Sequence, residues 1–152
     1  MSSIRIYRPN AKNLGHAASF TFVAGTEKSS PSVYIQIVRQ ASWDGEKRIG
    51  TFHKGNQGDD NSISVKLSPW ELGAFIYSID TQTKFNTVHK FERESTQIVF
   101  NTFSGQGGAT VWGLSIGRGE KRYTVSLTLA DAIVLRQFLV NSLDKLIEAD
   151  AV

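Results

Sequence analysis

The feature that most constrains the fold of this sequence is a strand-to-helix junction that occurs twice, 60 residues apart. Residues 65–71 read VKLSPWE, and residues 125–131 read VSLTLAD. Each junction has a Ser or Thr followed three positions later by an acidic residue, which is the pattern of a capping box at the start of a helix. The sequence therefore predicts one helix from residue 69 to about 79 and a longer one from 129 to about 148.

Apolar and polar residues alternate in the segments before and between these junctions. Because successive side chains of a strand point to opposite faces, such alternation indicates strands that are buried on one side only. It is clearest in 33–38, 62–67 and 122–127, and further strands are expected near 19–24, 47–54, 85–92, 96–103 and 109–117. The expected fold class is α+β, with two four-stranded antiparallel sheets that are each followed by a helix.

The chain is long enough for one core. It has 152 residues, of which 40% are hydrophobic, and this favours one domain over two independent ones. We expect a single domain over residues 15–148, with half-repeats at about 15–80 and 81–148. A basic arm, residues 1–14, precedes the domain, and a short tail, residues 149–152, follows it.

The arm is basic because the first acidic residue of the chain is Glu27. The basic residues before it are Arg5, Arg8, Lys12 and His16. This composition suits contact with nucleic acid. The alternatives are a disordered terminus and an edge strand, since Ile4, Ile6 and Tyr7 are apolar enough to pair with a sheet.

The composition also excludes several classes of protein. The absence of cysteine removes disulfides, thiolate metal sites and cysteine nucleophiles. No apolar run approaches the roughly 18 residues of a membrane span, and the N-terminus lacks the apolar core of a signal peptide. We therefore expect an intracellular, cytoplasmic protein with no membrane partner, whose net charge of +3 is compatible with polyanions.

No catalytic or metal site is expected. Residues 113–117 match the Gly-x-Ser-x-Gly pattern of a hydrolase, but they lie inside an alternating strand, and no histidine follows His89 to act as the base. His16, His53 and His89 lack the short spacing of a metal site. The sequence therefore predicts a protein that is not an enzyme and has no cofactor and no metal ion.

Cations interleaved with aromatic residues are the chemistry that remains. On strands they suit single-stranded nucleic acid, because phosphates meet the cations while unpaired bases stack on the rings. Two Gly-Glu-Lys-Arg turns, residues 45–48 and 119–122, would place such cations at the rims of the sheets. The candidate nucleic-acid-binding residues are Trp43, Lys47, Arg48, Phe52, Lys54, Lys66, Lys84, Lys90, Arg118, Lys121 and Arg122. In the alternative interpretation the aromatic residues form the core and the cations only keep the protein soluble.

The last predicted helix is apolar over more of its surface than one sheet can cover. Its apolar residues fill an arc of roughly 200°, whereas a helix that rests on a sheet needs little more than about 100°. They are Ile133, Leu135, Phe138, Leu139, Val140, Leu143, Leu146 and Ile147. Either the other helix or a second copy of the chain must cover the excess, and we expect a homo-oligomer.

The order of elements and several short segments resemble the Whirly family of single-stranded-DNA-binding proteins. These segments are residues 62–68 (SISVKLS), 85–89 (FNTVH) and 123–128 (YTVSLT), the last of which leads into the long helix. Residues 15–18 (GHAA) faintly resemble the family's Lys-Gly-Lys-Ala-Ala-Leu motif, with both lysines and the leucine replaced. The family shares its half-unit of a four-stranded sheet and a helix with the coactivator positive cofactor 4.

The resemblance implies two antiparallel sheets, helices packed between protomers and an oligomer, with a tetramer favoured over a dimer. It also implies binding of single strands along the sheets with little dependence on base sequence. The plant members carry organelle transit peptides that this chain lacks, so we expect a bacterial or phage protein, or a processed organellar form.

The leading hypothesis is a protein that binds single-stranded DNA and protects or organises it in replication, recombination, repair or transcription. The nearest alternative is binding of single-stranded RNA on the same fold. The alternative from another class is a β-sandwich that binds carbohydrate or protein, in which Trp43, Trp112 and Tyr34 would stack on the partner.

Overall fold

The computed structural model describes residues 2–55 and 60–150, which form two antiparallel sheets and two α-helices. The first half contains β1 (Ser2–Arg8), β2 (His16–Val23), β3 (Ser32–Asp44), β4 (Ile49–Phe52), β5 (Ser62–Leu67) and α1 (Pro69–Thr81). The second half contains β6 (Phe85–Phe91), β7 (Glu94–Ser104), the short turn η1 (Gln106–Gly108), β8 (Thr110–Arg118), β9 (Lys121–Leu127) and α2 (Leu129–Glu148). The predicted α+β repeat of sheet, helix, sheet and helix is confirmed.

The first sheet contains five strands but is only four strands wide, because β4 and β5 both pair with β3. Its order is β1-β2-β3-β4, and β5 also pairs with β3. Residues 33–38 of β3 pair with β5, whereas Gln40 and residues 42–44 pair with β4 on either side of a bulge. β4 and β5 therefore lie end to end beside one long strand. β1 is the strand at the opposite edge of this sheet. The arm predicted at residues 1–14 is thus an edge strand over residues 2–8, and the second sheet has the simple order β6-β7-β8-β9.

Both capping boxes are present. The Ser68 hydroxyl accepts a hydrogen bond from the Glu71 backbone, and the Glu71 carboxylate accepts one from the Ser68 backbone at 2.8 Å. Thr128 and Asp131 form the same reciprocal pair at the start of α2. α1 runs two residues further than predicted and ends at Thr81, because the left-handed backbone of Gln82, the C-cap residue, breaks the helix.

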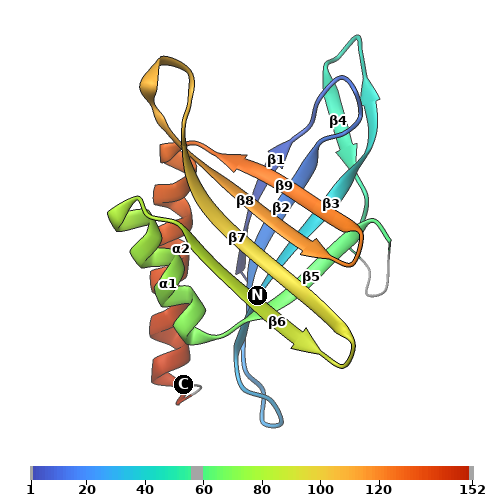
Figure 1. The fold of residues 1–152 in the computed structure, drawn as a ribbon. Coiled ribbons are helices and arrows are strands. Elements are labelled where there is room, and N and C mark those ends of the chain that lie inside the picture. Colours follow the sequence, from blue (N-terminus) through green and yellow to red (C-terminus); the bar gives the residue numbers. More distant parts are fainter. Residues whose placement is uncertain (1, 56–59, 151–152) are drawn as a thin grey trace.

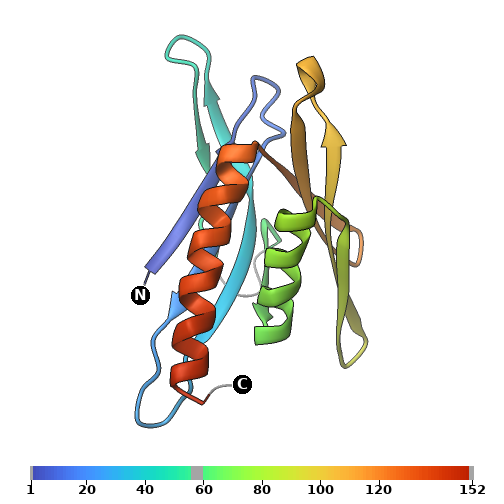
Figure 2. The same ribbon diagram turned by 90° about the vertical axis from the view of Figure 1, so that its left-hand side faces the viewer.

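The two sheets pack through their inner faces, and the helices lie side by side along one end of both sheets (Figures 1 and 2). One hydrophobic core contains residues of both sheets and both helices, with Phe20, Phe75, Phe100 and Trp112 among its largest buried side chains. Arg136 of α2 donates two hydrogen bonds to Asp80 of α1, at 2.5 and 2.9 Å. Neither helix in the described part of the chain is long and apolar enough to cross a membrane.

The helices leave an apolar face outside the core. Leu135, Leu139 and Leu146 of α2 are buried, whereas Ile133 and Val134 are each 57% exposed. The other large exposed apolar residues of the two helices are Trp70, Tyr77, Leu129 and Ile147. The first helix and the sheets therefore cover part of the predicted apolar arc, and the remainder faces outward.

Candidate nucleic-acid interface

The outer face of the first sheet follows directly from the alternation of its strands. In β1, Ile4 and Ile6 pack on the core, so Arg5 and Tyr7 point to the other side. The pairing register places Arg5 opposite Ser19 of β2, which in turn lies opposite Gln36 of β3. Tyr7 belongs to a parallel row with small and apolar neighbours on β2 and β3. A cation and an aromatic ring therefore lie next to each other on the outer face of the edge strand β1. The neighbouring side chains on β2 and β3 are shorter.

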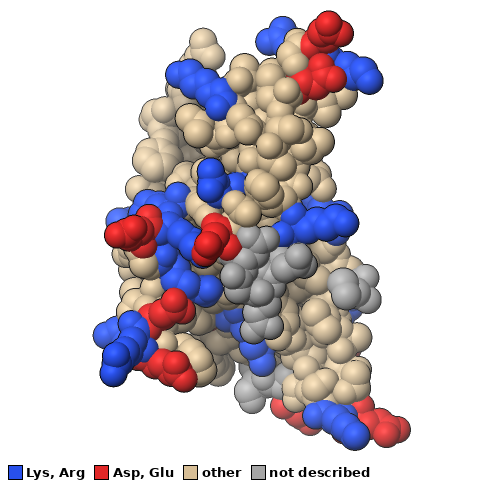
Figure 3. Space-filling model, turned by 90° about the vertical axis from the view of Figure 1, so that its right-hand side faces the viewer, with Lys and Arg blue, Asp and Glu red and all other residues tan. Residues whose placement is uncertain are grey.

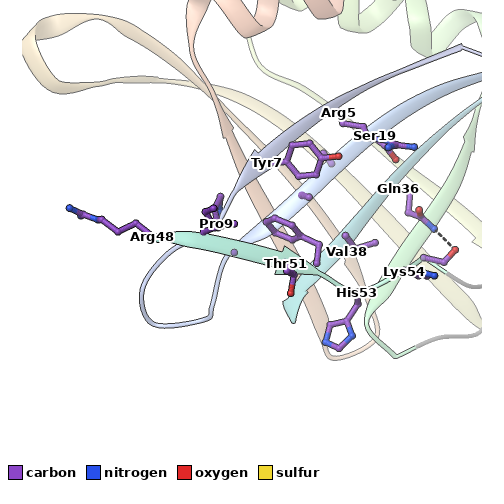
Figure 4. A pocket seen from close by; sticks show the side chains of 16 residues that line it. Arg5, Tyr7, Pro9, Ser19, Gln36, Val38, Arg48, Thr51, His53 and Lys54 are labelled. Carbon is purple, nitrogen blue, oxygen red and sulfur yellow. Dashed lines mark hydrogen bonds between the residues drawn. The ribbon is translucent and has the colours of Figure 1, made fainter. Parts of the chain in front are cut away.

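A hollow of about 780 Å³ lies on this face (Figure 4). Its floor is the outer side of β1, β2 and β3, and its wall is β4 with residues 53–55, which follow β4. The rings of Tyr7 and Phe52 meet across the hollow with their centroids 5.5 Å apart and their planes at 42°. Arg5 and Lys54 line the same hollow, and Arg48 extends away from it at the opposite end from Arg5. An exposed ring, a half-buried ring and cations are thus combined in one concave surface.

Hydrogen bonds fix the wall of this hollow. The Gln36 amide donates to the backbone carbonyl of Gly55 at 3.1 Å and to the hydroxyl of Ser64 at 2.8 Å. The backbone N–H of His53 donates to the carbonyl of Arg39 at 2.9 Å. The segment after β4 is therefore held against β3.

A buried glutamine holds the other end of the wall. Gln40, which is 3% exposed, accepts hydrogen bonds from the backbone N–H groups of Asn10 and Gly15 at 2.9 and 3.0 Å. It donates to the carbonyls of Asn10 and Ser42. Gly50 of β4 passes so close that a Cβ atom there would lie 2.6 Å from Pro9. The loop before β2 and the hairpin of β4 are thereby locked together.

A second groove, of about 870 Å³, runs between the first sheet and the tips of the second. Arg118 crosses it, donating to the Thr96 hydroxyl at 2.6 Å and to the Ser64 carbonyl at 2.9 Å. The Lys121 ammonium lies 3.6 Å from the Asp60 carboxylate. Tyr34, Lys66 and Phe91 also line this groove. This groove also contains cations and rings, but Arg118 and Lys121 already interact with other residues of the protein.

Two histidines lie where elements of the two halves meet. His89 is 2.6 Å from Glu71 of the first capping box. Burial alone would raise the pKa of Glu71, but hydrogen bonds from Ser68 and the nearby His89 outweigh burial and lower that pKa. His16 stacks on Tyr123, and burial lowers its pKa although the Thr124 carbonyl acts in the opposite direction. In the described residues no group of three His, Asp or Glu could hold a metal ion.

All the predicted binding residues except Lys84 lie in three places rather than one. The β3–β4 hairpin and the segment after it carry Trp43, Lys47, Arg48, Phe52 and Lys54. The groove between the sheets contains Lys66, Arg118 and Lys121. Lys90 and Arg122 lie on the outer face of the second sheet, since they neighbour strand positions whose side chains point inward. Lys84 precedes β6 and stands apart from all three.

The candidate binding residues include none from β1, although contact with nucleic acid was one interpretation of the basic arm, residues 1–14. Arg5 and Tyr7 line the hollow, and the signal was available in the alternation of Ile4 and Ile6 with them. Two aromatic residues that stood near predicted cations, Trp112 and Tyr123, are instead buried in the core. For them the alternative interpretation of core packing is the right one.

Basic side chains gather across the middle of the face that lies opposite the helices, with acidic side chains beside some of them (Figure 3). This face includes the groove between the sheets. The charge distribution therefore favours the side of the molecule away from α1 and α2 for an anionic partner.

No protein-family model matches the sequence, and no curated protein matches it. Solved structures that are similar over most of the chain include the following three. The plant transcriptional regulator PBF-2, a Whirly protein, has a TM-score of 0.66 and 17% identity, covering 97% of this chain and 82% of its own. Trypanosoma bruciei MRP1/MRP2 has a TM-score of 0.61 and 17% identity, covering 93% and 83%.

The third is a guide-RNA-binding protein complex bound to a gRNA, with a TM-score of 0.58 and 17% identity over 93% of this chain and 89% of that one. All three likenesses concern the path of the backbone, because the identities are low. Together with the two sheets, the capped helices and the element order, they show that this chain has the Whirly fold.

Proposed function

We propose that this protein binds single-stranded nucleic acid, with DNA favoured over RNA, and protects or organises unpaired strands. The observation that carries the proposal is the hollow on the first sheet, in which the rings of Tyr7 and Phe52 lie between cations. Rings accept the flat face of any base, and cations bind phosphate in any sequence. The binding is therefore sequence-tolerant.

The rows of outward residues suggest how a strand crosses the sheet. One unpaired base stacks on the Tyr7 and Phe52 rings while Arg5 and Lys54 bind the phosphates next to it. The register continues the path from Thr21 of β2 through Tyr34 to Lys66 of β5, which opens into the second groove. A duplex fits this surface poorly, because its bases already stack on one another inside the helix.

Binding of RNA uses the same surface, and the similarity to a complex that holds a gRNA makes it the second candidate. Stacking on rings does not separate the two sugars, so the choice of DNA rests on the similarity to the Whirly fold. The carbohydrate-binding alternative is weakened, since Trp112, one of its three expected stacking residues, is fully buried.

The proposal includes a homo-oligomer, with a tetramer favoured over a dimer. Its support is the outward apolar face of the helices, to which Trp70 and Ile133 contribute. A second copy placed there would bury this surface and leave the outer faces of both sheets open to a strand. Sedimentation velocity at micromolar concentration tests it, and a monomer would contradict it.

The test of binding is a fluorescence-anisotropy titration with labelled 20-nucleotide single strands of DNA and RNA and with the matched DNA duplex. Single strands should bind more tightly than the duplex. Their affinity should fall as salt rises, by about 0.7 in the slope of log K against log salt for each phosphate contact. Equal or tighter binding to the duplex, or binding that ignores salt, would contradict the proposal.

A further inference from the structure

The outer face of the second sheet carries an arginine that lies flat across it. Arg122 of β9 donates to the Ser115 hydroxyl of β8 at 3.0 Å and to the side-chain amide oxygen (Oε1) of Gln97 on β7 at 3.1 Å. The pairing register puts Arg122, Gly117 and Gln97 in one row across three strands. The side chain therefore runs along the surface, over the glycine, instead of extending away from it.

Gly117 provides the floor for this guanidinium. A Cβ atom at Gly117 would lie 2.9 Å from Nη2, 3.1 Å from Cζ and 3.5 Å from Nε of Arg122. Gly117 is buried although it faces outward, because Arg122 covers it. Its φ angle lies outside the left-handed region, so the backbone does not need glycine there. What the position requires is the absence of a side chain.

The arrangement leaves one side of the guanidinium plane free. Arg122 is exposed as a residue, and its hydrogen-bond partners are neutral. Across residues 2–55 and 60–150 no carboxylate is within ion-pair distance of it. A fixed guanidinium plane with uncompensated charge is a surface on which an unpaired base stacks.

The same device occurs four residues earlier in β8. Phe103, which is 56% exposed, lies over Gly113, where a Cβ atom would be 2.7 Å from the ring. Gly113 and Gly117 share one face of the strand and lie about 13 Å apart at the usual rise per residue. The face thus offers two flat platforms, one cationic and one aromatic, each seated on a glycine.

We propose that the outer face of the second sheet is a separate base-stacking surface, with one unpaired base on the Arg122 guanidinium and another on the Phe103 ring. This inference rests on the proposed function, which places the main site on the first sheet. It assigns Arg122 a stacking role, in contrast to a simple contact with phosphate.

The test separates stacking from charge with Arg122→Lys, which keeps the charge and removes the plane. Two labelled probes are used, an oligo-dT of 12 nucleotides and an abasic strand with the same number of phosphates. The variant should bind oligo-dT about five- to tenfold more weakly, as for the loss of one stacked base, and should bind the abasic strand as wild type does. Arg136→Lys, the same change on the helical side, is the matched control and should alter neither affinity.

Gly117→Ala provides a second variant that leaves Arg122 in place. The added Cβ lifts the guanidinium from its floor, so this variant should also weaken oligo-dT binding, by about two- to fivefold, with unchanged abasic binding. An unchanged melting temperature would show that the sheet itself is intact.

Three other outcomes count against the inference. Equal weakening of both probes by Arg122→Lys would identify a phosphate contact made by the guanidinium fork and overturn the stacking role. No effect of Arg122→Lys or Gly117→Ala on either probe, combined with weaker binding by Tyr7→Ala, would overturn the second surface and leave the proposed function standing. Failure of the wild type to bind either probe would refute both.

Discussion

The two sheets share an inner face of the same kind, yet their outer faces are built differently. The first sheet is concave outside, because β4 and residues 53–55 fold over it and form a wall. On the outer face of the second sheet, the side chains of Phe103 and Arg122 lie flat over glycines of β8. The comparison teaches that the repeat is maintained where the shared core demands it, at the alternating apolar positions and the helix caps. Outside the core each half has its own surface chemistry.

The largest expected effect is on stability, and it tests the hydrophobic core that the two halves share. Leu139→Glu places a charge at a position that is completely buried, so the protein should unfold, with a loss of more than about 4 kcal/mol. Ile133→Glu, six residues earlier on the same helix, changes an exposed residue and should leave the fold intact while it dissociates the proposed oligomer. Circular dichroism measures whether each variant is folded, and sedimentation velocity measures its oligomeric state. A folded Leu139→Glu variant would contradict the assignment of the core.

The next prediction asks which outer face contributes more to binding. Removing both rings of the hollow, with Tyr7→Ala and Phe52→Ala together, should weaken single-strand binding by on the order of 30-fold, because the one base that stacks on both rings contributes about 1–3 kcal/mol. Phe103→Ala on the second sheet should cost about fivefold in the same anisotropy assay. Tyr7→Phe keeps the ring and should bind normally. A larger loss from Phe103→Ala would make the second sheet the main surface.

Local patterns in the sequence were enough to predict the shared part of the molecule. The capping boxes at Ser68 and Thr128 involve residues only three positions apart, so they could be identified without any knowledge of the tertiary structure. Alternation likewise indicated the strands and, with them, the fold class. These features are local, and both halves repeat them.

The hollow could not be predicted in the same way. It depends on a bulge between Gln40 and Ser42 and on contacts of Gln40 with a loop 25–30 residues away. Interleaving of cations with rings in the sequence did not separate Phe52, which lines the hollow, from Trp112, which is buried. Strand pairing over long sequence separations decides which rings are exposed, and the sequence pattern does not contain it.

The wall of the hollow itself can be weakened. Gln40→Ala removes the side-chain acceptor of the Asn10 and Gly15 backbone N–H groups and leaves that of buried Gly15 without its partner, so the free energy of unfolding should fall by about 1–3 kcal/mol. Gln97→Ala, the glutamine that holds Arg122 on the exposed face of the second sheet, should change it by less than about 0.5 kcal/mol. Urea denaturation of both variants measures the difference. Equal effects would mean that the wall depends on contacts other than Gln40.

The smallest expected effect compares the two capping boxes in acid. Burial would raise the pKa of Glu71 and of Asp131, but the backbone and hydroxyl of the cap, with His89 or Arg8 beside them, lower both below their ordinary values of 4.5 and 3.8. A carboxylate whose folded pKa is lowered stabilises the fold above its unfolded pKa, and this contribution is lost as pH falls through the folded pKa. The contribution of Glu71 to the free energy of unfolding should therefore begin to fall below about pH 4.5, and that of Asp131 only below about pH 3.8. Glu71→Gln should flatten the stability curve at the higher of these pH values, and Asp131→Asn should flatten it only further into acid. Urea denaturation from pH 6 to pH 3 measures both curves, and the same onset in the two variants would show that the caps are not titrating separately.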